Sequence, residues 1–152
     1  RLFALVAMSI CDGVTVSWQA KATYFSWRPA IAIHEAALDD NPLTEPDSAW
    51  TPRNISIGAS PEYISGTSTF SGAASAAIEI FYGKSQFNFC FETDGASDGP
   101  RCYRSPLEGA REAGRSRIYQ GIHFQFSNEA GLEVGRRIGR EIATTRLRKV
   151  RY

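Results

Sequence analysis

The opening segment constrains the fold of this chain most. Residues 2–25 contain no proline, and apolar side chains recur every fourth position at Leu2, Val6, Ile10, Val14 and Trp18, with Tyr24 further along. This is the period of an amphipathic helix. The sequence therefore predicts a long, mostly buried helix, in which Gly13 is tolerated at some cost.

The same segment bears on membrane insertion and secretion. Asp12 and Gly13 interrupt its apolar run, and no small-residue cleavage site follows them. We therefore expect no stretch that reaches the roughly 18 apolar residues of a membrane span. A buried helix is favoured over a signal peptide for the same reason. Because the first residue is Arg1 and not Met, we expect a processed chain or part of a longer one.

Further helices are predicted from their start and stop residues. Pro29 suits the first turn of a short helix that runs to about Ala37. Residues 39–57 are rich in proline and predict a surface loop. Ser65 or Gly66 caps a helix of small residues over 66–82, which Gly83 ends.

Two more helices are expected in the second half of the chain. Ser105-Pro106 with Glu108 has the spacing of a capping box and predicts a helix to about Tyr119. A last helix, capped by Ser127 or Asn128, should run to about Thr145. We expect its inward face to carry four apolar residues, Leu132, Val134, Ile138 and Ile142.

The cysteines lie around the one predicted hairpin. Polar and apolar residues alternate over 86–91, and the chain should return through Cys102 and Tyr103. Cys90 and Cys102 flank a Gly/Asp-rich loop that a disulfide can close, whereas Cys11 is interpreted as a buried free thiol. This usage slightly favours a periplasmic or extracellular location over a cytoplasmic one.

Length and composition complete the expected fold. With 152 residues, of which 43% are apolar, the chain is most simply one domain over residues 1–152. The predicted fold is all-α, a helical bundle with one small β-hairpin. The net charge is +1. The arginine-rich stretch 136–151 is interpreted as the solvated face and tail of a last helix, with an interaction tail as the alternative. No nucleic-acid motif accompanies that stretch, so no nucleic-acid partner is expected.

Three short polar segments are candidates for chemistry. Lys21 and Arg28 flank a helix end, and Arg117 and His123 straddle a glycine break. Ser65-Gly66 opens a helix, where unpaired N–H groups and the helix dipole favour an anion. Taken singly, each has a plainer interpretation: exposed cations, an ordinary helix cap, or a histidine in the core.

The spacing of the three segments resembles the vanadium-dependent haloperoxidase and type 2 phosphatidic acid phosphatase superfamily. Its pattern is Lys, six residues, Arg-Pro; then Pro-Ser-Gly-His; then Ser-Arg, five residues, His. The first and third parts match fully at Lys21-Arg28-Pro29 and at Ser116-Arg117-His123. The segment 61–73 is similar to the middle motif of the soluble bacterial branch. The resemblance covers about residues 1–145.

The resemblance implies a site for phosphate or vanadate. Lys21, Arg28 and Arg117 would neutralise the equatorial oxygens, and Ser65 and the Gly66 N–H would donate to them. His123 would attack phosphorus in a phosphatase or bind vanadium in a peroxidase. Both activities depend on positioned cations and donors.

The chain departs from the family pattern at three points. Thr67 stands where the family has its acid/base histidine. Ser127 stands where the family often has the acid that orients the last histidine, with Asn128 or Glu129 as nearby substitutes. Family members usually have further helices before the Lys motif, whereas this chain starts about one helix ahead of Lys21. We therefore expect either a fragment, or a protein partner or second copy that completes the bundle. His34 is the only other histidine.

The matches to the family pattern and the departures from it favour two different functions. The intact Lys21, Arg28, Ser65, Gly66, Arg117 and His123 favour a haloperoxidase-like or phosphatase-like enzyme. Thr67 and the short length favour a non-catalytic family member that serves as a binding or structural subunit.

Overall fold

The computed structural model describes residues 1–53, 56–92 and 99–148. It confirms an all-helical fold with one small hairpin. The elements in chain order are α1 (Leu2–Tyr24), α2 (Pro29–His34), the 3-10 helix η1 (Ala36–Leu38), α3 (Gly66–Tyr82), β1 (Phe89–Phe91), β2 (Arg101–Tyr103), α4 (Pro106–Tyr119) and α5 (Gln125–Thr145).

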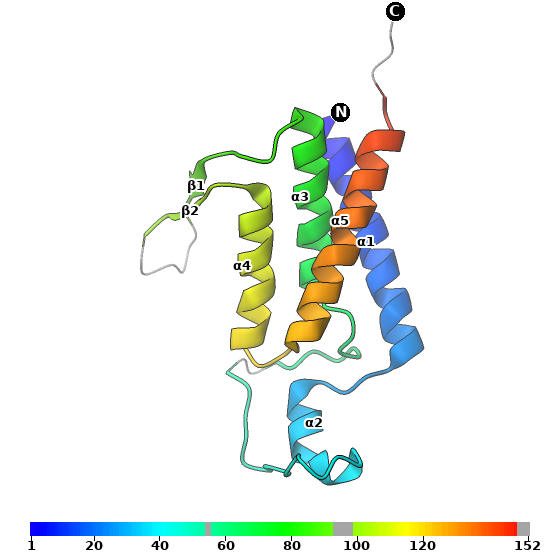
Figure 1. Cartoon of the computed structure of the whole chain (residues 1–152), viewed down its shortest axis with the longest axis vertical. Helices are drawn as coiled ribbons and strands as arrows, with labels where there is room; N and C mark the ends of the chain where they lie inside the picture. The colour runs from blue at the N-terminus through cyan, green and yellow to red at the C-terminus, as the bar shows by residue number, and fades with distance from the viewer. Residues whose placement is uncertain (54–55, 93–98, 149–152) are drawn as a thin grey trace, which may run out of the picture.

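The four long helices form an elongated bundle. Helix α3 packs against α1, α4 and α5, and α1 also contacts α5 (Figure 1). The two-stranded antiparallel hairpin lies beside the start of α4. Helix α2 and the loop that follows it lie beyond one end of the bundle, the end at which α1 finishes and α3 begins.

Glycine, not a large apolar side chain, forms the contact between α3 and α5. A Cβ atom on Gly135 would lie 2.0 Å from the Thr69 carbonyl oxygen, and one on Gly139 would lie 2.1 Å from that of Ala73. The two helix backbones therefore touch. The predicted inward face was wrong in register: Leu132, Val134 and Ile138 are half-buried, and of the four predicted residues only Ile142 is fully buried.

Helix α1 also buries a stripe of mainly small residues. Its buried positions recur every fourth residue: Leu5, Ser9, Gly13, Ser17 and Lys21. The apolar residues expected inside are half-buried or exposed, with Trp18 at 56% exposure. The prediction of a mostly buried helix was therefore wrong, and Cys11 is exposed and not buried. The face of α1 that packs closely against the bundle carries small side chains, so the periodicity of large apolar residues identifies a different face of the helix.

The hydropathy of this region bears on the expected absence of a membrane span, which stays a prediction. The helical stretch Leu2–His34 has an 18-residue window with mean hydropathy 1.4, of which 22% is buried. By length and composition it is apolar enough to cross a membrane, although no uninterrupted apolar run exists. Core helices of soluble proteins and signal sequences meet the same criterion.

Most of the predicted helix starts and the hairpin are confirmed. Ser65 caps α3, and the Ser105 hydroxyl accepts from the Glu108 N–H at 3.0 Å at the start of α4. Cys90 pairs with Cys102 in the hairpin register and forms the disulfide. Helix α5, however, begins at Gln125 after the cap Phe124. Ser127 and Asn128 thus lie inside its first turn, facing the core.

Candidate functional site

The predicted site residues come from five segments that meet at one end of the bundle. Lys21 lies in the last turn of α1, and Arg28 is the N-cap of α2. Ser65 caps α3, Arg117 lies in the last turn of α4, and His123 lies in the loop between α4 and α5. Figure 1 shows these helix ends together, with α2 beneath them.

Lys21 is held by the segment that precedes α3. Its ammonium group donates to the Pro61 carbonyl at 2.5 Å and to the Glu62 carbonyl at 2.9 Å, and the side chain is buried. An ammonium group has three N–H donors. These bonds account for two of them, so a third remains for a ligand.

Arg28 joins the same segment to the last histidine. Its Nε donates to the Ser60 carbonyl at 2.9 Å, and Nη2 donates to the Ser60 hydroxyl at 3.0 Å. Its Nη1 donates to the Ile122 carbonyl at 2.8 Å and lies 3.1 Å from Nε2 of His123. Gly58, at φ 80°, leaves room for this guanidinium, since a Cβ there would lie 3.1 Å from Nη2.

His123 is paired with a residue that the sequence analysis did not identify. Its Nδ1 lies 2.6 Å from Oε1 of Glu62, and the same oxygen accepts from the Phe124 N–H at 3.0 Å. The Glu62 side chain has no exposed surface, and its Oε2 has no hydrogen-bond partner among the described residues. Glu62 lies three positions before Ser65, but no local feature of the sequence marks it as a partner of His123.

The start of α3 presents backbone N–H groups that can donate hydrogen bonds to a ligand. The Ser65 hydroxyl oxygen accepts from the Ser68 N–H at 3.4 Å and lies 2.9 Å from the Ser68 hydroxyl, which in turn donates to Asn128 at 2.6 Å. No described residue accepts from the N–H groups of Gly66 or Thr67. Ser65 is thus an ordinary helix cap as well, and two unpaired N–H groups remain for an anion.

Arg117 is the fourth basic side chain of the cluster. Its Nη1 donates to Gln120 at 2.8 Å, while its buried Nε has no partner within the described part of the chain. An unpaired, buried guanidinium N–H is costly unless a ligand accepts from it. Arg117 is close enough to Arg28 to lower the pKa of that residue.

We call the set Lys21, Arg28, Glu62, Ser65, Gly66, Arg117 and His123 the cradle. Its electrostatics favour an anion, because the set holds three cationic side chains, Lys21, Arg28 and Arg117, and only one carboxylate, Glu62. Burial and the neighbouring Arg28 lower the pKa of Lys21 to about 8. Burial also lowers the pKa of His123, while its hydrogen bond to Glu62 opposes that change. A bound dianion would relieve this repulsion.

The remaining candidates lie elsewhere or take other partners. His34 has its Nε2 2.7 Å from the Trp50 carbonyl and fixes the loop after α2, outside the cradle. Glu129 is exposed and accepts from Gln125, and Asn128 contacts Ser68. Neither orients His123 in the structure. Thr67 is half-buried in the first turn of α3.

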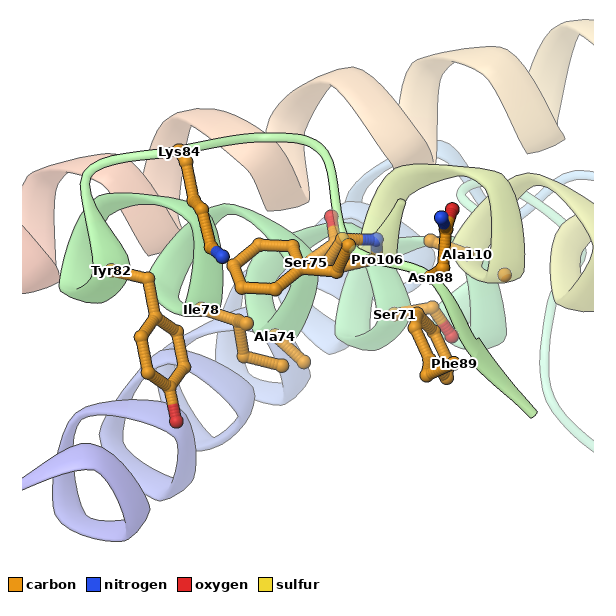
Figure 2. A pocket seen from close by; sticks show the side chains of 12 residues that line it. Ser71, Ala74, Ser75, Ile78, Tyr82, Lys84, Asn88, Phe89, Pro106 and Ala110 are labelled. Carbon is orange, nitrogen blue, oxygen red and sulfur yellow. The ribbon is translucent and has the colours of Figure 1, made fainter. Parts of the chain in front are cut away.

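A groove of about 680 Å³ lies between α3, α4 and the segment that leads into the hairpin. Figure 2 shows Ile78, Ala74 and Tyr82 of α3 along one side, and Pro106 and Ala110 of α4 on the other. No cradle residue lines it. The groove is therefore a separate feature, and it is mainly apolar.

The model for the VCPO second helical-bundle domain matches residues 1–151, nearly the whole chain. The chain belongs to the vanadium haloperoxidase family. No curated protein matches it.

Solved structures of vanadium haloperoxidases share the bundle. A bacterial vanadium-dependent iodoperoxidase superposes with a TM-score of 0.80 at 28% identity, covering 97% of this chain and 33% of that one. The holo form of a bacterial vanadium-dependent chloroperoxidase gives a TM-score of 0.71 at 17% identity, covering 92% and 35%. The chain thus spans about a third of the length of these haloperoxidases.

Proposed function

We propose that the cradle binds a tetrahedral oxyanion, and that with vanadate bound there the protein oxidises halide with peroxide. The observation that carries this proposal is the excess of buried positive charge around His123. Arg28 contacts the ring directly, and Lys21 donates to the carbonyl of Glu62, which pairs with the ring. Arg117 lies close enough to Arg28 to lower the pKa of that residue, and Glu62 is the one acid in contact with the ring among the described residues. Such a cluster is stable only if an anion or strong hydrogen bonding compensates it.

The residues present fit vanadate or phosphate. Arg117 Nε is buried and unpaired, and the Gly66 and Thr67 N–H groups begin a helix of 17 residues. These donors, with the third N–H of Lys21, would hold the oxygens of the anion. His123 would supply Nε2 as the ligand to vanadium. Bound vanadate would supply the activation of peroxide toward the halide.

The chain's own residues would set the rate through charge and proton supply. The net reaction joins halide, hydrogen peroxide and one proton to give hypohalous acid and water. The cationic groups would stabilise negative charge on the anion's oxygens as the reaction proceeds. Thr67 supplies a hydroxyl that does not titrate near neutral pH, so general acid–base catalysis at that position is weak. We therefore expect low turnover.

The test is peroxide-dependent oxidation of iodide, the halide that is oxidised most easily. Protein loaded with vanadate should produce iodine at a rate that His123→Ala abolishes and His34→Ala retains. Phosphate should inhibit by occupying the same cradle. Vanadate-loaded protein with no activity above that of free vanadate would contradict the peroxidase proposal.

Exposed apolar side chains favour a second role, as one subunit of an assembly. On α1, Phe3 is 89% exposed and Trp18 is 56% exposed. Exposed apolar surface of this kind commonly marks a contact with another protein. Light scattering during size-exclusion chromatography tests this role: a dimer would support it, and a monomer at all concentrations would weigh against self-association.

A further inference from the structure

We propose that Glu62 is the positioning residue for His123, fixing the ring so that Nε2 is the nitrogen offered to the bound anion. The proposal rests on the proposed oxyanion site and concerns the geometry of the ring within it. In the superfamily pattern this role often falls to an acid four residues after the histidine. Here that position is Ser127, whose hydroxyl has no partner among the described residues.

The contacts on the two ring nitrogens select one tautomer. Arg28 can only donate hydrogen bonds, so Nε2, 3.1 Å from its Nη1, must carry a lone pair. A carboxylate only accepts, so Nδ1, 2.6 Å from Glu62 Oε1, must carry the proton. The two neighbours therefore demand the same neutral form of the ring. In that form the nucleophilic nitrogen faces the basic side chains.

Glu62 also fixes the backbone on which the ring is carried. Its Oε1 accepts from the Phe124 N–H, next to His123, while its own carbonyl accepts from Lys21. One residue thus connects the histidine, the loop before α5 and the end of α1. A fully buried carboxylate with one oxygen unpaired costs stability. Its presence is explained by the orientation that it gives to His123.

A matched set of variants separates orientation from charge. Glu62→Gln keeps an acceptor oxygen without the negative charge, and Glu62→Leu removes both. If Glu62 orients the ring, vanadate affinity should fall about 10- to 100-fold in Glu62→Leu, the usual effect of losing a partner that orients a metal-binding histidine. Glu62→Gln should retain most of the affinity. Glu129→Leu, an exposed glutamate of α5, serves as the control and should change nothing.

Phosphate is the second probe, because it is held by charge and hydrogen bonds without a bond to Nε2. Its affinity should not fall in either variant, since each removes a negative charge that repels the anion. A purely electrostatic role for Glu62 predicts that both variants bind vanadate more tightly than the wild type. That outcome would overturn the proposal.

Nitrogen-15 NMR of the histidine ring gives a readout that needs no ligand. The wild-type spectrum should show the proton of His123 on Nδ1, and Glu62→Leu should show exchange between both tautomers. A proton on Nε2 in the wild type would overturn the proposal, even if the leucine variant did not fold. If the wild type binds neither anion, the proposed function fails, and the NMR comparison alone decides the role of Glu62.

Discussion

At the scale of single residues, the cradle keeps the basic side chains of the superfamily pattern, while Thr67, beside Gly66, departs from that pattern. We predict that Thr67→His raises peroxide-dependent iodide oxidation at least about tenfold, because a positioned general acid typically contributes 100-fold or more. Thr67→Gln, of similar size without a titrating group, should give no gain. Vanadate-loaded Thr67→His with unchanged turnover would contradict the idea that this position limits the rate.

Lys21 should make anion binding depend on pH. Its pKa is lowered to about 8 by burial and by Arg28, so the empty cradle loses one positive charge above that pH. Phosphate, a dianion in this range, should bind well below pH 8. Its affinity should then fall by up to about tenfold per pH unit, because binding becomes coupled to proton uptake. Calorimetric titrations from pH 7 to 10 measure this.

The control for this dependence is Lys21→Arg, whose guanidinium stays charged throughout the range. Its phosphate affinity should be flat where that of the wild type falls. Equal slopes for the two proteins would show that another group titrates.

Residues within spaced motifs could be predicted from the sequence, whereas a residue whose partner is distant in the sequence could not. Motif spacing predicted that Lys21, Arg28, Arg117 and His123 lie together, and they do meet at one end of the bundle because that spacing preserves which helix ends they occupy. Their role in anion binding stays a prediction. Glu62 was missed because its partner, His123, lies 61 positions away, and no local pattern marks a buried carboxylate. Only the fold places the two side chains together.

At the scale of elements, helix packing depends on glycines that apolar periodicity does not reveal. We predict that Gly135→Ala lowers the free energy of unfolding by about 2 kcal/mol or more, in the range of overpacked cores. The added Cβ would lie 2.0 Å from the Thr69 carbonyl oxygen, so α3 and α5 must separate. Urea unfolding followed by circular dichroism provides the measurement.

Gly109→Ala in α4 is the matched control. A Cβ at this position would lie 3.8 Å from the Tyr103 ring, an ordinary contact. Alanine also favours a helix over glycine by about 1 kcal/mol, so this variant should be slightly more stable than the wild type. Equal destabilisation of both variants would contradict the close-packing account.

The helix boundaries and the buried faces were predictable to different degrees. Proline and serine at Ser105-Pro106 fix a helix start chemically, so the start of α4 was correct. The buried faces of α1 and α5 were wrong because small residues such as Ser9, Gly13 and Gly135 occupy the buried positions of these helices. Small side chains carry no hydrophobic signal, although they decide how near two helices approach.

At the scale of the whole molecule, the Cys90–Cys102 disulfide indicates the redox state of the compartment in which the protein resides. Thiol titration of the denatured protein should give one free thiol, from Cys11, without reductant and three after reduction. A stable Cys90–Cys102 bond supports our proposal of a periplasmic or extracellular location, since such bonds persist in oxidising compartments. Three free thiols in protein purified from its native location would contradict that proposal.

The central claim is that the end of this bundle forms a working oxyanion cradle around His123. Calorimetric titration with vanadate tests it most directly, with the wild type, His123→Ala and the control His34→Ala. The account predicts saturable binding to one site in the wild type and in His34→Ala, and an affinity at least about tenfold weaker in His123→Ala. Absence of binding by folded wild type, or equal binding by His123→Ala, would contradict it.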